Sequence, residues 1–188
     1  IKTASVFAAQ KQVDKAKDEL RRGYRQNPDS GLIVTSLTRL YVANKDYSSA
    51  IDLCKTRLEK NDKESFTWNL LGGVYLAKKN LDDAQAAFEK AVELTPEWGK
   101  PYDNLARIYL ARGEKDDAIR KFNSALQKNP QNKSAWMILG SIYEKDKTYE
   151  KAAVTYKTAF KNNPDLWAAA NNYAFIKSEF STSETDLQ

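Results

Sequence analysis

Residues 133–166 read KSAWMILGSIYEKDKTYEKAAVTYKTAFKNNPDL, and this stretch decides the fold. In its first half, large and small apolar residues recur with helical spacing, at Trp136, Leu139, Gly140 and Tyr143. In its second half, the same kind of spacing joins Ala152, Tyr156 and Ala159. An α-helix turns once in about 3.6 residues, so each set lies on one helical face. Pro164 follows where a helix would end. The stretch therefore predicts two helices packed face to face.

The same arrangement returns every 34 residues along the chain. Four residue types keep this step: Tyr41, Tyr75, Tyr109 and Tyr143; Leu37, Leu71, Leu105 and Leu139; Ala16, Ala50, Ala84, Ala118 and Ala152; and Pro96, Pro130 and Pro164. A fixed period of this length is the signature of a helical repeat array. A single repeat cannot bury its own apolar face, so the repeats must stack.

This pattern resembles the tetratricopeptide repeat family, and the segments that begin at Ser65, Gly99 and Lys133 match it throughout. The resemblance implies an all-α fold of about eleven helices with no strand. The helices would form a right-handed superhelical solenoid whose concave face is lined by the first helix of each repeat. It divides the chain into a partial repeat at 1–30, a divergent repeat at 31–64, full repeats at 65–98, 99–132 and 133–166, and a partial repeat or capping helix with a polar tail at 167–188. The repeat at 31–64 is divergent because Cys54 and Arg57 replace the usual aromatic residue and Ala.

The composition excludes several kinds of chemistry. The 188 residues include no His and one Cys, so the chain lacks the residues for a His-based catalytic triad, a His-ligated metal site or an intrachain disulfide. No basic-then-apolar signal segment opens the chain, and no apolar run approaches the roughly 20 residues that cross a bilayer. We therefore expect no enzyme, no cofactor and no membrane span. The compartment stays open between the cytoplasm and a bacterial periplasm or envelope.

The small residues and the polar ends of the repeats carry local predictions. Gly72 and Gly140 are expected to let the first helix approach Ala84 and Ala152 of the second. Asn80 and Thr148 are expected to cap second helices. Three aromatic residues occupy core positions of the repeat, which favours packing over base stacking: Trp68, Tyr102 and Trp136. Cys54 also occupies a core position, which indicates a buried, inert thiol.

Four positions of each first helix point away from the core and into the expected groove. They are the second, fifth, ninth and twelfth residues of the repeat. The fold does not fix their identity, so they are the candidate partner-binding residues. Those that combine apolar anchors with hydrogen-bonding groups are Phe66, Asn69, Lys100, Asp103, Arg107, Met137 and Asn171. Some family members grip a C-terminal carboxylate at fixed groove positions. Only Asn104, or Lys100 in the other register, fits that clamp here, so the clamp is absent.

The favoured function is a scaffold that binds a peptide or a partner protein in the groove and performs no catalysis. The alternative is an accessory domain of a larger enzyme or of a bacterial envelope or polysaccharide-export protein. Nucleic-acid binding is disfavoured, because the net charge of +5 is small and two of the six segments are net acidic, so no continuous basic stripe forms. Three apolar residues near the end of the last repeat are expected to be left open and to permit self-association: Phe175, Ile176 and Phe180.

Overall fold

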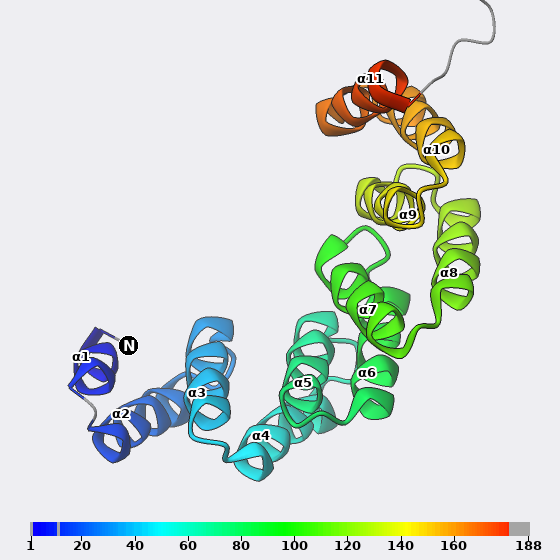
Figure 1. The fold of residues 1–188 in the computed structure, drawn as a ribbon. Coiled ribbons are helices and arrows are strands. Elements are labelled where there is room, and N and C mark those ends of the chain that lie inside the picture. The colour runs from blue at the N-terminus through cyan, green and yellow to red at the C-terminus, as the bar shows by residue number, and fades with distance from the viewer. Residues whose placement is uncertain (1, 11, 181–188) are drawn as a thin grey trace, which may run out of the picture. The chain divides into compact units, whose positions relative to one another are not determined.

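The computed structural model describes residues 2–10 and 12–180. Within these residues the chain forms eleven α-helices and no strand (Figure 1). The helices fall into two compact units, residues 1–94 and 95–188. None of the described helices is both long and apolar enough to span a membrane. The predicted all-α array of helical hairpins is confirmed.

The first unit contains six helices in sequence: α1 (Lys2–Ala9), α2 (Val13–Gln26), α3 (Gly31–Ala43), α4 (Tyr47–Lys60), α5 (Ser65–Ala77) and α6 (Leu81–Leu94). Each helix packs on the next one along the chain, and α3 also packs on α5. The first helices of successive hairpins are therefore neighbours in space as well as in the repeat pattern.

The second unit contains the other five helices: α7 (Gly99–Arg112), α8 (Lys115–Lys128), α9 (Lys133–Lys145), α10 (Tyr149–Asn162) and α11 (Trp167–Phe180). Here too each helix packs on its successor, and α7 packs on α9. We propose the repeat boundaries given above for the folded chain, since α3, α5, α7, α9 and α11 each begin at the first residue of one of those segments.

The buried core residues recur with the 34-residue period of the sequence. The five alanines on the 34-residue step are fully buried: Ala16, Ala50, Ala84, Ala118 and Ala152. The aromatic residues four positions after the last three of these are buried as well: Phe88, Phe122 and Tyr156. Burying a large side chain contributes about 1.5–3 kcal/mol. In α6, α8 and α10 the second helix therefore supplies both the small residue and the ring that fill the hairpin.

The glycines of the first helices approach these rings. A Cβ atom at Gly72 would lie 2.7 Å from the ring of Phe88, and one at Gly140 would lie 2.3 Å from the ring of Tyr156. We predicted that the glycines approach Ala84 and Ala152. The nearest atoms instead belong to Phe88 and Tyr156, one turn after those alanines. The glycine is required because the ring occupies the space of a side chain.

The turns inside the hairpins also follow the period. Lys45, Lys79, Gly113 and Lys147 all have a left-handed backbone, with φ of 58°, 65°, 71° and 57°. They stand 34 residues apart, at the end of the first helix. A left-handed residue at this place is a common way to end an α-helix. Only one of the four positions holds glycine, the residue that adopts a left-handed backbone without strain. The left-handed turn is therefore imposed by the fold and not by the residue type.

Side chains cap some of the helices. Asn80 accepts a hydrogen bond from the backbone N–H of Asp83 at 3.3 Å, as predicted. Thr148 was predicted to cap α10 and does not, because its hydroxyl donates to the backbone carbonyl of Tyr143 at 3.1 Å. In this orientation the hydroxyl oxygen makes no capping hydrogen bond to the first turn of α10.

An ion pair joins three repeats in the first unit. The Arg57 side chain is nearly buried and donates to both carboxylate oxygens of Glu64. It also donates to the backbone carbonyl of Pro28 and to the hydroxyl of Thr67. Burial raises the pKa of Glu64, but the hydrogen bonds from Arg57 and Thr67 outweigh it, so the pKa lies below its usual value. Arg57 is therefore a structural substitute for the consensus Ala and not a defect in the repeat.

Neighbouring glycines of α5 give a matched test of the helix contact. We expect Gly72→Ala to destabilise the chain by about 1–3 kcal/mol, the usual result of overpacking a core. A Cβ at Gly73 has nothing within 4 Å, so Gly73→Ala should instead stabilise the helix by up to about 1 kcal/mol. Urea unfolding followed by circular dichroism measures both. Equal stability of the two variants would contradict the assigned contact.

The ion pair gives a pH-dependent prediction. The carboxylate of Glu64 is favoured in the folded state, so its stabilising effect is present above the unfolded pKa of about 4.3 and is lost as the pH falls through the lower folded pKa. Glu64→Gln should cost about 1.5–3 kcal/mol at pH 7, the usual range for hydrogen bonds to charged groups, and the difference from the parent should shrink on acidification.

Glu59→Gln, at an exposed position of α4, is the control for this measurement. Urea unfolding midpoints at several pH values from about 7 down to 3 provide the comparison. If the two variants lose stability equally at pH 7, the Arg57 pair does not hold the repeats together.

Candidate binding groove

A groove of about 440 Å³ lies between α7 and α9 in the second unit. Both helices contribute to it, and so does Leu166, the residue that precedes α11. Its lining consists of Asp103, Ala106, Arg107, Leu110, Lys133, Ser134, Met137, Ile138, Ser141, Ile142, Lys145 and Leu166. The groove is therefore formed by the packing of two first helices, at the place where the repeat pattern predicts the concave face.

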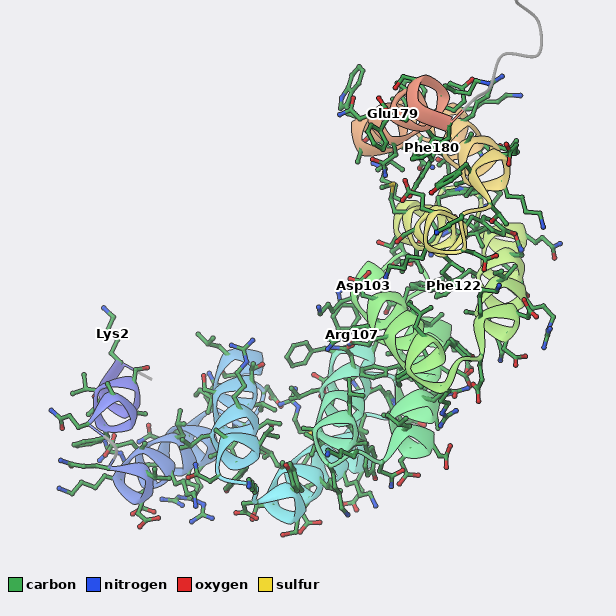
Figure 2. All side chains as sticks on the ribbon, viewed as in Figure 1. Lys2, Asp103, Arg107, Phe122, Glu179 and Phe180 are labelled. Carbon is green, nitrogen blue, oxygen red and sulfur yellow. The ribbon has the colours of Figure 1, made fainter. Side chains whose placement is uncertain are left out.

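Helical periodicity explains which side chains line it. On α7, Asp103, Arg107 and Leu110 follow each other by four and three residues and so share one face. Figure 2 shows Asp103 and Arg107 on the side of α7 that faces away from α8, whereas Phe122 lies between α8 and α7. The core face and the groove face of α7 are thus opposite sides of one helix.

The floor of the groove is apolar and its rim is charged. Half of the lining is hydrophobic: Ala106, Leu110, Met137, Ile138, Ile142 and Leu166. Ala106 and Ile142 are buried beneath it, and Leu110 is 38% exposed. Asp103 and Arg107 are exposed. This combination accepts an apolar side chain below and offers hydrogen-bonding groups to a ligand above.

The rim has an excess of positive charge, since Arg107, Lys133 and Lys145 face a single lining acid, Asp103. Lys133 is also paired with Asp165, just outside the lining. The hydrogen bond from Lys133 lowers the pKa of Asp165 below its usual value. A guanidinium such as that of Arg107 binds a carboxylate through two parallel hydrogen bonds.

Three of the seven predicted binding residues meet in this groove: Asp103, Arg107 and Met137. Lys100 on α7 and Asn171 on α11 are exposed in the same unit but do not line it. Phe66 and Asn69 lie on α5 in the other unit, where both are partly buried. Phe66 lies close to Gly31, where a Cβ would be 3.6 Å from the phenyl ring.

Sequence reasoning missed part of the lining. Lys133, Ile138, Lys145 and Leu166 belong to the groove although they lie outside the four positions used for prediction. On α9 the lining residues form a stripe two residues wide along the helix. The signal in the sequence is the charge of Lys133 and Lys145, which stand on the same helical face as Met137.

The other singled-out residues are structural. Cys54 is fully buried, and burial raises the pKa of its thiol to about 12, so it is unreactive at neutral pH. Tyr102 is buried, while the indole N–H groups of Trp68 and Trp136 donate to the backbone carbonyls of Asp62 and Pro130. Among the described residues, no group of His, Cys, Asp and Glu could hold a metal ion.

Comparisons with known proteins agree with this architecture. A family model described as tetratricopeptide repeat matches residues 64–131, and a second with the same description matches residues 104–166. Together they span more than half of the chain. No curated protein matches the sequence. The chain belongs to the tetratricopeptide repeat family.

Solved structures show the same fold at low sequence identity. A thermophilic tetratricopeptide repeat protein of Thermus thermophilus aligns with a TM-score of 0.56 at 18% identity, over 94% of this chain and 96% of its own. MamA aligns with a TM-score of 0.57 at 18% identity, over 88% and 96%. PilF of Pseudomonas aeruginosa aligns with a TM-score of 0.57 at 16% identity, over 94% and 86%. Proteins of this family are in general non-catalytic scaffolds that bind protein partners or peptides, and this chain has the architecture of such a scaffold.

Proposed function

We propose that this chain is a non-catalytic scaffold that binds an extended segment of a partner protein in the groove between α7 and α9. The observation that carries the proposal is the apolar floor around Met137 and Ile138 beneath the exposed guanidinium of Arg107. An extended peptide alternates its side chains, so one residue can enter the floor while its neighbour meets the rim.

The chemistry of the rim selects the segment. The excess of cations favours a segment with an acidic residue, which Arg107 can hold through two hydrogen bonds. An apolar residue next to it would contact Met137 and Leu110. Lys100 and Asn171 are exposed in the same unit and would contact a longer segment. Phe66 and Asn69 remain proposed contacts of the first unit.

The absence of catalysis is proposed from the residues themselves. The sequence has no His, and the thiol of Cys54 is buried with a raised pKa. Neither a proton-transferring imidazole nor an accessible thiolate is then available to activate a nucleophile near neutral pH.

The test is a capture experiment followed by affinity measurements. Proteins retained by the immobilised chain are identified by mass spectrometry, and their binding is then measured by calorimetry. We expect Arg107→Ala and Met137→Ala each to weaken binding by about 2 kcal/mol, as interface hot spots do. Arg107 is exposed, so Arg107→Ala should change stability by no more than about 0.5 kcal/mol. Met137 is partly buried and packs against the core of α10 and α11, so urea unfolding must show that Met137→Ala is folded before the affinities are compared.

Arg120→Ala is the matched control, because it removes the same charge from α8, where Arg120 is highly exposed and pairs with Asp117. It should leave binding unchanged. If Arg120→Ala lowers the affinity for the partner while both groove variants bind it as tightly as the unsubstituted chain, the partner binds the other face and the proposal fails.

A further inference from the structure

The first unit has a groove of its own, where α1 and α3 both pack on α2 (Figure 1). The volume of this groove is about 270 Å³. All three helices contribute to its lining, which consists of Ala4, Ser5, Ala16, Leu20, Ser36, Arg39, Leu40 and Ala43. None of the seven predicted binding residues is among them, so this groove is not part of the function proposed above.

The groove lies at the same repeat positions as the groove between α7 and α9. Six of its lining residues stand three 34-residue steps before residues that line the other groove. The pairs are Ala4 with Ala106, Ser5 with Arg107, Ser36 with Ile138, Arg39 with Ser141, Leu40 with Ile142, and Ala43 with Lys145. Because α7 and α9 belong to interior repeats of the sequence, these positions line a groove there as well. The groove of the first unit is therefore a property of the repeat.

The polar groups of the two grooves are arranged as mirror images. In each groove, the ninth repeat position of the two facing helices holds one Arg and one Ser. In the second unit the earlier helix carries Arg107 and the later helix carries Ser141. In the first unit the earlier helix carries Ser5 and the later helix carries Arg39. Each groove thus has one guanidinium at the same level, on opposite walls.

The guanidinium of Arg39 is available to a ligand. Arg39 is exposed, and it is the one charged residue in the described lining of its groove. It forms no ion pair with any residue that the structure describes. A guanidinium binds a carboxylate through two parallel hydrogen bonds, and no acid in the lining competes for it. The groove therefore favours a ligand with an acidic group.

The floor of this groove is apolar, and α2 supplies its deepest part. Ala16 is fully buried and Leu20 is 5% exposed, and both line the cavity. Leu20 stands at the repeat position of Phe122 and Tyr156, whose rings are buried in later hairpins. A leucine side chain is smaller than these rings, so part of the corresponding space remains as a cavity. An aliphatic side chain of a ligand can be buried there, which removes its apolar surface from water.

We propose that the groove formed by α1, α2 and α3 is a second binding site, which takes a segment with an acidic residue next to an aliphatic residue. The acid pairs with Arg39, and the aliphatic side chain contacts Leu20 and Leu40. The chain then holds two such segments at once, one in each unit. A partner that carries two segments binds more tightly than a partner with one, because the second binding event becomes intramolecular. The inference rests on the proposed function for the class of ligand, but the two sites share no residue.

The probe is the blocked tetrapeptide acetyl-Ser-Asp-Leu-Ser-amide, titrated to about 10 mM into the isotope-labelled full chain and followed by two-dimensional NMR. We expect saturable shifts in two separate sets of signals, one around Arg39 and one around Arg107. Each set should include the side-chain N–H of its arginine. A peptide with Asn in place of Asp should bind at least about tenfold more weakly, because a neutral amide forms no charged hydrogen bond with the guanidinium.

Variants of the chain test the role of Arg39. Arg39→Ser should abolish the shifts around α1 and α3 and leave those around α7 and α9 unchanged. Adding Ser5→Arg moves the guanidinium to the opposite wall, as in the groove between α7 and α9. This double variant should recover binding to within about threefold of the parent, and a loss of folding cannot produce such a recovery. Arg22→Ala is the control, because it removes an exposed arginine of α2 that pairs with Glu19, and it should leave both sets of shifts unchanged.

The two sets of signals separate the possible outcomes. Shifts confined to α7 and α9 would overturn the second site and leave the proposed function standing. Shifts confined to α1, α2 and α3 would support the second site and contradict the proposed groove between α7 and α9. The second site is also overturned if no shifts saturate around Arg39, if the Asn peptide binds there equally well, or if Arg39→Ser leaves those shifts as they were.

Discussion

Two of the hairpins, α5 with α6 and α9 with α10, depend on one close approach, in which the ring of the second helix lies where a first-helix side chain would otherwise stand. Gly72 with Phe88 and Gly140 with Tyr156 are the clearest examples. Because these rings and the alanine one turn earlier are fully buried, the two helices have one spacing at which they pack without voids or clashes. The opposite face of the first helix does not pack in the hairpin core. On α7 and α9 this face lines the groove.

The boundaries between repeats depend on a second constraint, the need to satisfy a backbone carbonyl. Asn132 donates to the carbonyl of Pro96 at 2.6 Å and also caps α9. Glu64 stands at the same repeat position two steps earlier, and an ionised carboxylate has no hydrogen to donate. Arg57 supplies the donor instead, binding both Glu64 and the carbonyl of Pro28. Two different sets of side chains thus meet one backbone requirement.

The groove between α7 and α9 exists because two first helices pack side by side, and most of its lining lies at positions that the repeat consensus does not fix. Its apolar floor and cationic rim are the reason for proposing an extended segment with an acidic group as the ligand.

Much of the fold could be predicted from the sequence because the 34-residue period acts at every level. It identified the two-helix repeat, the buried alanines and the inert Cys54. The alanines at equivalent positions of successive repeats are all buried, so a core position found in one repeat predicts the core position in the next. It also indicated the groove face, where Asp103, Arg107 and Met137 meet. These features depend only on the spacing of residues along the chain, and that spacing is given by the sequence.

Only the tertiary structure decided how side chains use the space between helices. The capping prediction for Thr148 was wrong because its hydroxyl lies toward the carbonyl of Tyr143 and makes no hydrogen bond to the first turn of α10. Lys133, Lys145 and Leu166 line the groove because α7 and α9 converge there. Ile176, which was expected to be left open, is buried because it packs in the core that α10 and α11 share. The period fixes which face of a helix a residue occupies, whereas the distances between faces are set by the packed side chains of all the helices that meet there.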